Sequence, residues 1–345
     1  MSFTPGMMVP IGGIERELGR LWEASGEGKT RASLINLAIY SERENSLKEN
    51  AAVIHELSGE HAMRAILIEA DPNASGSSAE AWINMNCYLR GDKGGEVCSE
   101  QISFRLSGIA AQSLQSVVFS HLDSDLPLVL WWQADFRPSV DGKLWRWVDR
   151  LLFDSRQWKS PREQFELIKK IGGEKSRTIL CDLNWARTLP IRQALAGVFD
   201  CPGTLPGLHS ITTLRLDHAP GHRTTALLLV GWLADRLGWH LTMTGKNPQF
   251  QSATGGVVTL TLNEVAGPSV SRMLLSSDSA NFEVNRDSDS DFYITTATGS
   301  SIPETSRMIR APREETREVL LTELARGGRH PFYSAAVKAV QNLWD

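Results

Sequence analysis

The best candidate for chemistry in the sequence is an anion site. His222 and Arg223 follow Pro220 and Gly221, where a predicted strand has ended and a predicted helix begins. Backbone N–H groups at a helix start, joined by an arginine, are able to hold a phosphate or another anion. The sequence therefore offers His222 and Arg223 as anion-binding candidates, against the alternative of two surface residues beside a tight turn. The turn also keeps His218 off the helix face of His222, so a zinc-binding pair is not predicted.

Two segments match ligand-binding motifs only in part. Residues 25–30 end in Gly-Lys-Thr like a phosphate-binding P-loop, but Glu23 stands where that loop needs a glycine, and a predicted helix precedes the segment. Residues 287–291 alternate carboxylates like a calcium loop, but the sixth position is Phe292 and the twelfth is Thr298. Both segments are predicted to be polar turns.

Motifs of enzymes are missing as well. No G-x-G-x-x-G follows a predicted strand, so the chain is not expected to hold NADP. No G-x-S-x-G nucleophile turn is present. We therefore expect no catalytic residue, no metal and no cofactor, and a protein that is not an enzyme.

The four cysteines show no C-x-x-C spacing, which argues against a zinc site. Cys87 and Cys98 lie in two successive strand-like runs and could face each other across a hairpin. Because disulfides are rare in the cytosol, two free thiols are expected here, with a disulfide as the alternative. Cys181 and Cys201 are the other two.

The composition is that of an ordinary globular protein, with 345 residues and a net charge of −4. This charge gives no driving force for binding a phosphate backbone, so nucleic acid is not an expected partner. The first residues show no basic stretch followed by an apolar one, so no secretory signal is expected. The most apolar helix, around residues 226–239, carries Asp235 and Arg236 and is too short for a bilayer. A cytoplasmic protein without a membrane partner is predicted.

Residues 1–203 are expected to form an α/β domain with a mixed, largely parallel sheet. Apolar strands are predicted at 33–40, 64–70, 126–132, 150–155 and 177–183, with helices between them and an antiparallel hairpin at 81–106. Fully apolar strands alternating with helices are typical of a sheet covered on both faces. The closing helix is predicted at 184–199, with Asp182 capping its start. Trp185 and Arg192 are seven residues apart and share one face of that helix.

Residues 204–345 are expected to form an α+β domain. A strand at 208–218 leads to a helix ended by Gly238, and short β-type runs joined by polar turns fill residues 239–296. Such runs predict an antiparallel sheet. Two helices, at 314–326 and 331–343, finish the chain.

Tryptophan and arginine concentrate in one stretch of the first domain. Trp131 and Trp132 close a buried strand, and further tryptophans and arginines follow at Trp145, Arg146, Trp147, Arg150, Arg156 and Trp158. These residue types are enriched at interface hot spots, but the same rings also fill cores. Successive strand residues point to opposite faces, so only one ring of the pair enters a given core layer.

Several strings together carry a family resemblance. DLPLVLWW at 125–132, LLFDS at 151–155, DLNWAR at 182–187, and Arg192 followed by Phe199-Asp200 resemble the glucose-6-phosphate dehydrogenase assembly protein family, OpcA. Asn36-Leu37, His61, Arg64, CSEQI at 98–102 and GWLADRLGW at 231–239 stand in the order of that family. The resemblance runs from about residue 11 to about residue 240, and Ile191 departs from a tryptophan that is frequent there.

The resemblance implies a non-catalytic assembly factor or allosteric activator of glucose-6-phosphate dehydrogenase, in the oxidative pentose phosphate pathway. The partner-binding candidates are then Trp131, Trp132, Trp185, Arg187 and Arg192. The alternative is an enzyme or sensor that binds a sugar phosphate at the anion site near Gly221 to Arg223.

Overall fold

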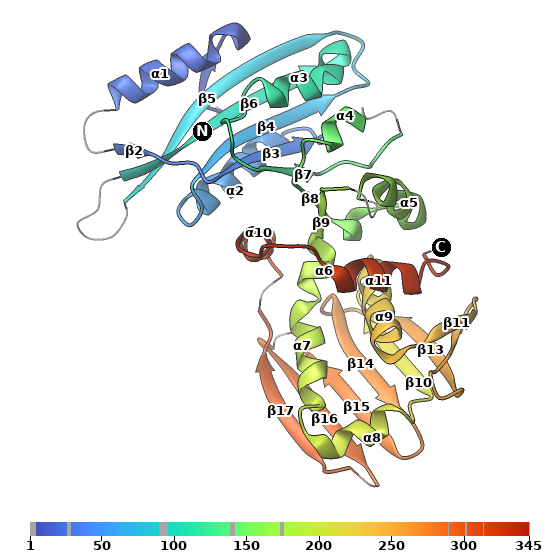
Figure 1. Ribbon diagram of the computed structural model, residues 1–345. Helices are drawn as coiled ribbons and strands as arrows, with labels where there is room; N and C mark the ends of the chain where they lie inside the picture. The colour runs from blue at the N-terminus through green and yellow to red at the C-terminus, as the bar shows by residue number, and fades with distance from the viewer. Residues whose placement is uncertain are drawn as a thin grey trace. The chain divides into compact units, whose positions relative to one another are not determined.

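The computed structural model describes residues 5–25, 29–89, 96–138, 142–172, 176–288, 290–300, 302–312 and 314–344. The chain divides into two compact units, labelled by element in Figure 1. The first contains Met1–Phe153 and Leu167–Cys181, and the second contains Asp154–Glu166 and Asp182–Asp345. This division differs from the predicted boundary at residue 203, because the helices after Asp182 pack in the second unit.

A mixed sheet forms the centre of the first unit. In the described residues it has nine strands, in the order β1 (Met7–Val9), β5 (Ser78–Leu89), β6 (Glu96–Ser107), β4 (Met63–Asp71), β3 (Ile35–Ser41), β7 (Leu128–Trp132), β8 (Arg150–Phe153) and β9 (Ile179–Asp182), with β2 (Lys29–Arg31) beside β6. The pairs from β6 through β4, β3 and β7 to β8 are parallel, and β1, β5 and β6 pair antiparallel. Residues 63–70 of β4 are all buried, which explains the apolar run at 65–68.

The strand order also fixes where a site is expected. From β3 the chain proceeds to β4 and β6 on one side, and then crosses to β7, β8 and β9 on the other. In such doubly wound sheets, ligands bind at the carboxyl ends of the two strands where the order reverses. In this protein those strands are β3 and β7.

The first unit also contains helices. They are η1 (Ile11–Gly13), α1 (Ile14–Ala24), α2 (Ser46–Ser58), η2 (Gly108–Ser113), α3 (Leu114–Phe119), α4 (Gly142–Trp145) and α5 (Pro161–Ile171), the last of which has residues in both units. The helix predicted before residues 25–30 is α1, which buries Ile14 and Leu18. The P-loop-like segment at 25–30 has residues 26–28 outside the described residues.

The predicted hairpin is present, and it corrects the expectation for its cysteines. Strands β5 and β6 pair antiparallel from Ser78 to Leu89, with the tip at 91–95 outside the described residues. Cys87 lies directly opposite Cys98, with 4.0 Å between their Cα atoms, and the two form a disulfide. The expectation of two free thiols was therefore wrong, because the register sets them face to face. Within the described part of the chain, Cys181 and Cys201 take no part in a disulfide.

The second unit contains a separate mixed sheet. Its eight described strands run in the order β11 (His240–Met243), β12 (Gln249–Gln251), β13 (Val257–Glu264), β10 (Thr213–His218), β14 (Val270–Ser276), β15 (Ala280–Asn285), β16 (Phe292–Gly299) and β17 (Thr305–Arg310). The pairing is antiparallel except between β10 and β13, which are parallel. The purely antiparallel prediction fails at that pair because a helix, and not a hairpin, follows β10.

Helices cover one face of the second sheet. The elements of this unit outside the strands are η3 (Ser155–Gln157), α6 (Leu183–Arg187), α7 (Leu189–Val198), η4 (Pro202–Thr204), α8 (Leu205–Leu208), α9 (Arg223–Leu237), α10 (Thr316–Ala325) and α11 (Pro331–Ala339). Of these, α7 and α8 contact β15, and α9 contacts β10 and β13 (Figure 1). The predicted helix at 184–199 is two helices, with Thr188 between them. Helix α9 ends at Gly238, which has a φ of 65° and is left-handed as predicted.

Among the described residues, no helix combines the length and the apolar character that crossing a membrane requires.

Candidate functional site

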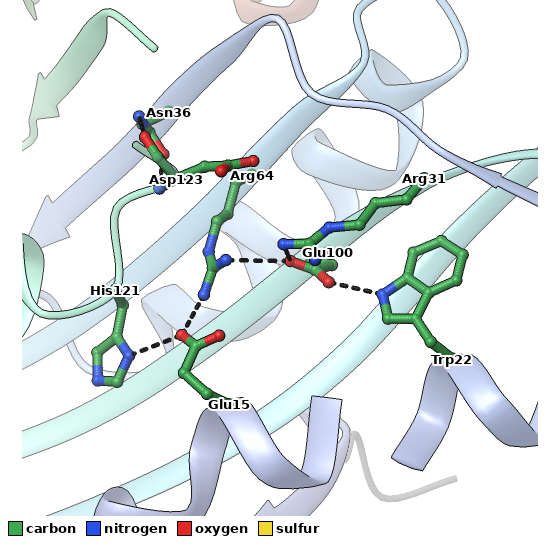
Figure 2. A network of polar contacts seen from close by, with 8 residues as sticks. All are labelled: Glu15, Trp22, Arg31, Asn36, Arg64, Glu100, His121 and Asp123. Atoms are coloured by element: carbon green, nitrogen blue, oxygen red, sulfur yellow. Dashed lines mark hydrogen bonds and ion pairs between the residues drawn. The ribbon is translucent and has the colours of Figure 1, made fainter. Parts of the chain in front are cut away.

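A buried ion pair lies where β4 begins in the first unit. The Arg64 side chain is 4% exposed and that of Glu100, on the adjacent strand β6, is 1% exposed. Arg64 Nη1 lies 3.3 Å from Glu100 Oε2. The same carboxylate accepts hydrogen bonds from Arg31 Nη2 at 3.0 Å and from Trp22 Nε1 at 2.6 Å (Figure 2). A buried carboxylate with three donors is a well-compensated charge.

The network continues to helix α1 and to the segment before β7. Arg64 also pairs with Glu15 of α1, and His121 Nδ1 lies 3.4 Å from the same carboxylate (Figure 2). The Asn36 amide donates to the carbonyls of Asp123 and Leu126 and accepts from the Asp123 N–H at 2.7 Å. Burial lowers the pKa of His121, and the Glu15 carboxylate opposes that effect. The network therefore fastens α1 and the segment before β7 to the sheet.

Three residues of this network belong to strings that carry the family resemblance. Asn36, Arg64 and Glu100 come from three separate strands, and their proximity could not be predicted from the sequence. The available signal was the presence of charged or amide side chains inside otherwise apolar strands. Such residues are almost never fully buried unless they are paired.

A carboxylate of the protein itself lies at the turn after β3. The Glu69 carboxylate, on β4, accepts a hydrogen bond from the backbone N–H of Leu47 at 3.2 Å and from the Ser46 hydroxyl at 3.3 Å. Arg105 Nε donates to its other oxygen at 2.8 Å. Leu47 lies in the first turn of α2, where a dinucleotide fold binds the pyrophosphate. With a carboxylate there and no glycine-rich turn, the residues present do not fit a dinucleotide.

In the second unit, Asp182 caps α6 as predicted. Its Oδ1 accepts hydrogen bonds from the backbone N–H groups of Asn184 at 2.9 Å and Ser155 at 3.1 Å. The Asn184 side chain in turn donates to the Ser155 hydroxyl and accepts from Thr225 of α9 at 2.7 Å. The start of α6 is thereby tied to η3 and to α9.

Trp185 and Arg192 lie on two helices, α6 and α7, and not on one helix as predicted, but their side chains meet. The Arg192 guanidinium lies 3.7 Å from the centroid of the Trp185 ring, and Arg192 Nε donates to the Thr188 hydroxyl at 3.0 Å. Tyr333 contacts the same indole, with 5.7 Å between ring centroids. Burial is the main cause that lowers the pKa of Arg192 to about 10, so the guanidinium stays charged at neutral pH. Arg187 Nη1 pairs with Asp154 Oδ2 at 2.8 Å.

All five partner-binding candidates are buried. Their exposed fractions are 6% for Trp131, 3% for Trp132, 2% for Trp185, 7% for Arg187 and 8% for Arg192. These side chains position the elements that carry them and present almost no surface to a partner in this conformation. In the tryptophan-rich stretch of the first domain, Trp147 is an exposed residue, at 64%.

The structure separates the two anion-binding candidates. Arg223 Nη1 donates to the Leu343 carbonyl at 2.9 Å, so this arginine holds the C-terminal segment. His222 is half-buried at the N-cap of α9, and burial, then the Arg156 charge, lower its pKa. An imidazole with a lowered pKa is neutral at pH 7, which weakens its attraction for an anion.

The carboxylate-rich turn at 287–291, whose Asp289 is outside the described residues, lies between β15 and β16.

The pH dependence of stability should report the environment of Asp182. Burial raises its pKa to about 7 from an ordinary value of 3.8, and the Asp154 charge acts in the same direction. The folded state thus keeps a proton that the unfolded state releases, so stability is lost as pH rises from about 4 to about 7. We expect the free energy of unfolding of the wild type, minus that of Asp182→Asn, to fall over this window in urea titrations.

A matched variant separates charge from capping. Asp182→Ala loses both backbone hydrogen bonds and should cost about 1 kcal/mol or more. If the difference between wild type and Asp182→Asn were constant with pH, the raised pKa would be refuted.

The second sheet has an uncovered face with large apolar side chains. In β16, Tyr293 and Ala297 are buried, whereas the alternate residues Phe292 and Ile294 are 42% and 38% exposed. Ile294 pairs directly with Met308 of β17, which is 67% exposed. Single exposed apolar residues are ordinary, but a cluster on one sheet face is a candidate for an interaction surface. We call Phe292, Ile294 and Met308 the β16–β17 patch.

Comparison with known proteins identifies both halves of the chain. Residues 54–170 match the profile described as the glucose-6-phosphate dehydrogenase subunit N-terminal domain, and residues 178–337 match that of the C-terminal domain. An OxPP cycle protein named OpcA from Synechococcus elongatus is 29% identical over 145 residues, which cover 41% of this chain and 32% of that protein. The OpcA of Synechocystis sp. is 26% identical over 145 residues, covering 41% of this chain and 30% of that protein. The match thus spans about a third of the length of these relatives.

Solved structures match in fold. A mutant of the 3-ketoreductase KijD10 from Actinomadura kijaniata, in complex with NADP and TDP-benzene, has a TM-score of 0.51 at 10% identity, covering 90% of this chain and 96% of that one. At this identity the likeness concerns architecture alone. The family profiles match consecutive segments on both sides of residue 174, and the strings noted in the sequence from His61 to Trp239 fall in the same segments. The chain therefore belongs to the OpcA family of glucose-6-phosphate dehydrogenase assembly proteins.

Proposed function

We propose that this protein is a non-catalytic partner that assembles or activates glucose-6-phosphate dehydrogenase in the oxidative pentose phosphate pathway. The observation that carries the proposal is the match of both halves to domains described as parts of that dehydrogenase's subunit. The Glu69 carboxylate at the start of α2 supports it, because this turn does not suit the cofactor of an oxidoreductase.

Activation would follow from differential binding. A partner that binds the active state of an enzyme more tightly than the inactive state raises the population of the active state. The shift is limited by the difference between the two binding free energies, and the substrate tightens the partner's binding in return. No residue of this chain needs to enter the dehydrogenase active site.

A dehydrogenase assay with and without this protein, at varied glucose 6-phosphate, tests the proposal. We expect a lower KM or a higher kcat, saturable in the added protein, and comigration of the two proteins in size-exclusion chromatography. The control is the same protein after heat unfolding. Unchanged kinetics together with separate elution would overturn the proposal. If glucose 6-phosphate stabilised the isolated protein against heat, the alternative of a sugar-phosphate sensor near Gly221 to Arg223 would gain support.

The β16–β17 patch is our proposed contact surface. It lies on the face of the second sheet that α7, α8 and α9 leave uncovered, and its apolar side chains would be buried by a partner. Burial of such side chains removes apolar surface from water, which is the main favourable term in association.

We expect Met308→Lys to weaken binding to the dehydrogenase by about tenfold or more, because a charge would be buried at the centre of the patch. The matched control is Leu34→Lys, since Leu34 is also an exposed apolar residue, at 68%, but belongs to the first unit. Affinity is measured by surface plasmon resonance on variants with unchanged melting temperatures. Equal affinities of Met308→Lys and wild type would exclude the patch.

A further inference from the structure

Strand β17 is an edge of the second sheet (Figure 1). It stands last in the strand order, and among the described strands it pairs with β16 alone. Its six residues form a regular ladder with β16, without a shift of register, and those at 306–308 and 310 are exposed. A regular, exposed edge strand offers its unpaired backbone groups to another chain.

The strands at the other ends of the two sheet orders are shorter or irregular. β1 has three residues and β9 has four. β11 has four, and its pairing with β12 shifts register between Leu241 and Met243. Short edge strands and bulges keep a sheet edge from pairing with another chain. Of these four strands, β17 is the one that shows neither feature.

The register of β16 and β17 shows which backbone groups of the edge are unpaired. One residue beyond the ladder, the Ala311 N–H donates to the Asp291 carbonyl opposite it at 2.7 Å. Hydrogen-bonded and non-hydrogen-bonded pairs alternate along an antiparallel ladder, so Ser306, Met308 and Arg310 belong to pairs of the second kind. Their N–H and C=O groups therefore point away from β16, and no other described segment bonds to them.

The same three residues share a face of the sheet, because alternate residues of a strand point to one side. This is the face of the β16–β17 patch, to which Met308 belongs. A strand added beside β17 would lie about 4.8 Å from it and would place its own alternate side chains next to Met308. Backbone pairing at the edge and burial of the patch are thus compatible with one partner.

The edge strand is positively charged. Its two charged residues are Arg307 and Arg310, and both are exposed. Arg307 Nη1 donates to the Gly197 carbonyl of α7 at 3.2 Å, and in the described part of the chain no carboxylate pairs with either guanidinium. Two copies of β17 paired with each other would place four arginines along one seam, and like charges across strands are destabilising. A strand that carries carboxylates suits this edge better than a second copy does.

We propose that an extended, acidic segment of the dehydrogenase pairs with β17 and becomes an additional strand of the second sheet. The inference rests on the proposed function, and it names the kind of contact by which the partner is held. In such strand addition the backbone hydrogen bonds supply affinity and the alternate side chains supply specificity.

Ser306→Pro and Ser306→Ala test the proposal in the full chain. Proline removes the outward N–H and sets its ring in the path of an added strand, whereas alanine keeps the N–H. The fold tolerates proline at such a position, because this N–H takes no part in the pairing with β16. We expect Ser306→Pro to bind glucose-6-phosphate dehydrogenase about tenfold more weakly or worse in surface plasmon resonance, and Ser306→Ala to bind like the wild type. Melting temperatures check both variants.

Two further measurements address the backbone pairing and the charge. In hydrogen–deuterium exchange of the wild type, the N–H groups of Ser306, Met308 and Arg310 should exchange more slowly in the complex than in the free protein. Arg310→Glu reverses a charge of the edge and should weaken binding by about tenfold. Equal affinity of Arg310→Glu and wild type would refute the acidic character of the added strand.

The outcomes separate this inference from the proposed function. If the wild type binds the dehydrogenase but Ser306→Pro binds equally well, or if the three N–H groups exchange at an unchanged rate, pairing with β17 is refuted and the proposed function stands. A wild type that does not bind the dehydrogenase would overturn both. A dimer of the isolated protein in sedimentation that Ser306→Pro abolishes would assign the edge to a second copy of the chain instead.

Discussion

Replacing Gly231 with alanine should destabilise the protein by about 3 kcal/mol. A Cβ at this position of α9 would lie 2.1 Å from the Ala336 carbonyl oxygen and 2.8 Å from its carbon, both in the backbone of α11. Backbone atoms of a packed helix do not move aside as a flexible side chain does, so the two helices must separate. The measurement is the free energy of unfolding from urea titration, with the second unit expected to unfold first.

Gly19→Ala is the matched control for Gly231→Ala. Gly19 also lies inside a helix, α1, but a Cβ there would meet nothing within 4 Å. Alanine has the higher helix propensity, so this substitution should stabilise by about 0.5–1 kcal/mol. Opposite signs for the two variants would show that the close approach of α9 and α11, and not the loss of a glycine, causes the effect. Two effects of the same sign would contradict this account.

Glu100→Gln should cost about 3 kcal/mol of stability. The substitution preserves the shape of the side chain and removes its charge, which leaves the buried guanidinium of Arg64 with only Glu15, a residue whose side chain is 57% exposed. An uncompensated buried charge is far more costly than a lost surface pair. Thermal and urea unfolding at neutral pH measure the effect.

Arg31→Ala tests whether burial is the cause. Arg31 pairs with the same carboxylate, but its side chain is 47% exposed, so its loss should cost about 1 kcal/mol or less. If Arg31→Ala destabilised the protein as much as Glu100→Gln does, the number of ion pairs, and not their burial, would decide the stability of this network.

The elements could be predicted from local patterns, because their causes are local. The buried run of β4, the hairpin of β5 and β6, the cap at Asp182 and the stop at Gly238 each follow from a few neighbouring residues. Pairing between distant segments could not be predicted in this way. The parallel pair β10–β13 and the break at Thr188 depend on how elements far apart in the sequence pack.

The candidate site was predicted less well than the fold. Tryptophan and arginine are enriched both in interfaces and in well-packed interiors, and the sequence does not distinguish the two. Trp185 and Arg192, proposed from the sequence as partner-binding residues, stack on each other and are buried inside the second unit. The β16–β17 patch could not be predicted from the sequence, because Phe292 and Ile294 alternate with buried residues. Tertiary packing decides which side of the sheet the helices cover.

The Glu69 carboxylate at the start of α2 has a consequence for how the chain responds to its surroundings. A fold that relies on a bound nucleotide at this turn gains stability in proportion to the logarithm of the nucleotide concentration. Here the anion is part of the polypeptide, held by Leu47, Ser46 and Arg105. The stability of the first unit at this turn therefore depends on the chain's own carboxylate and not on the concentration of a nucleotide.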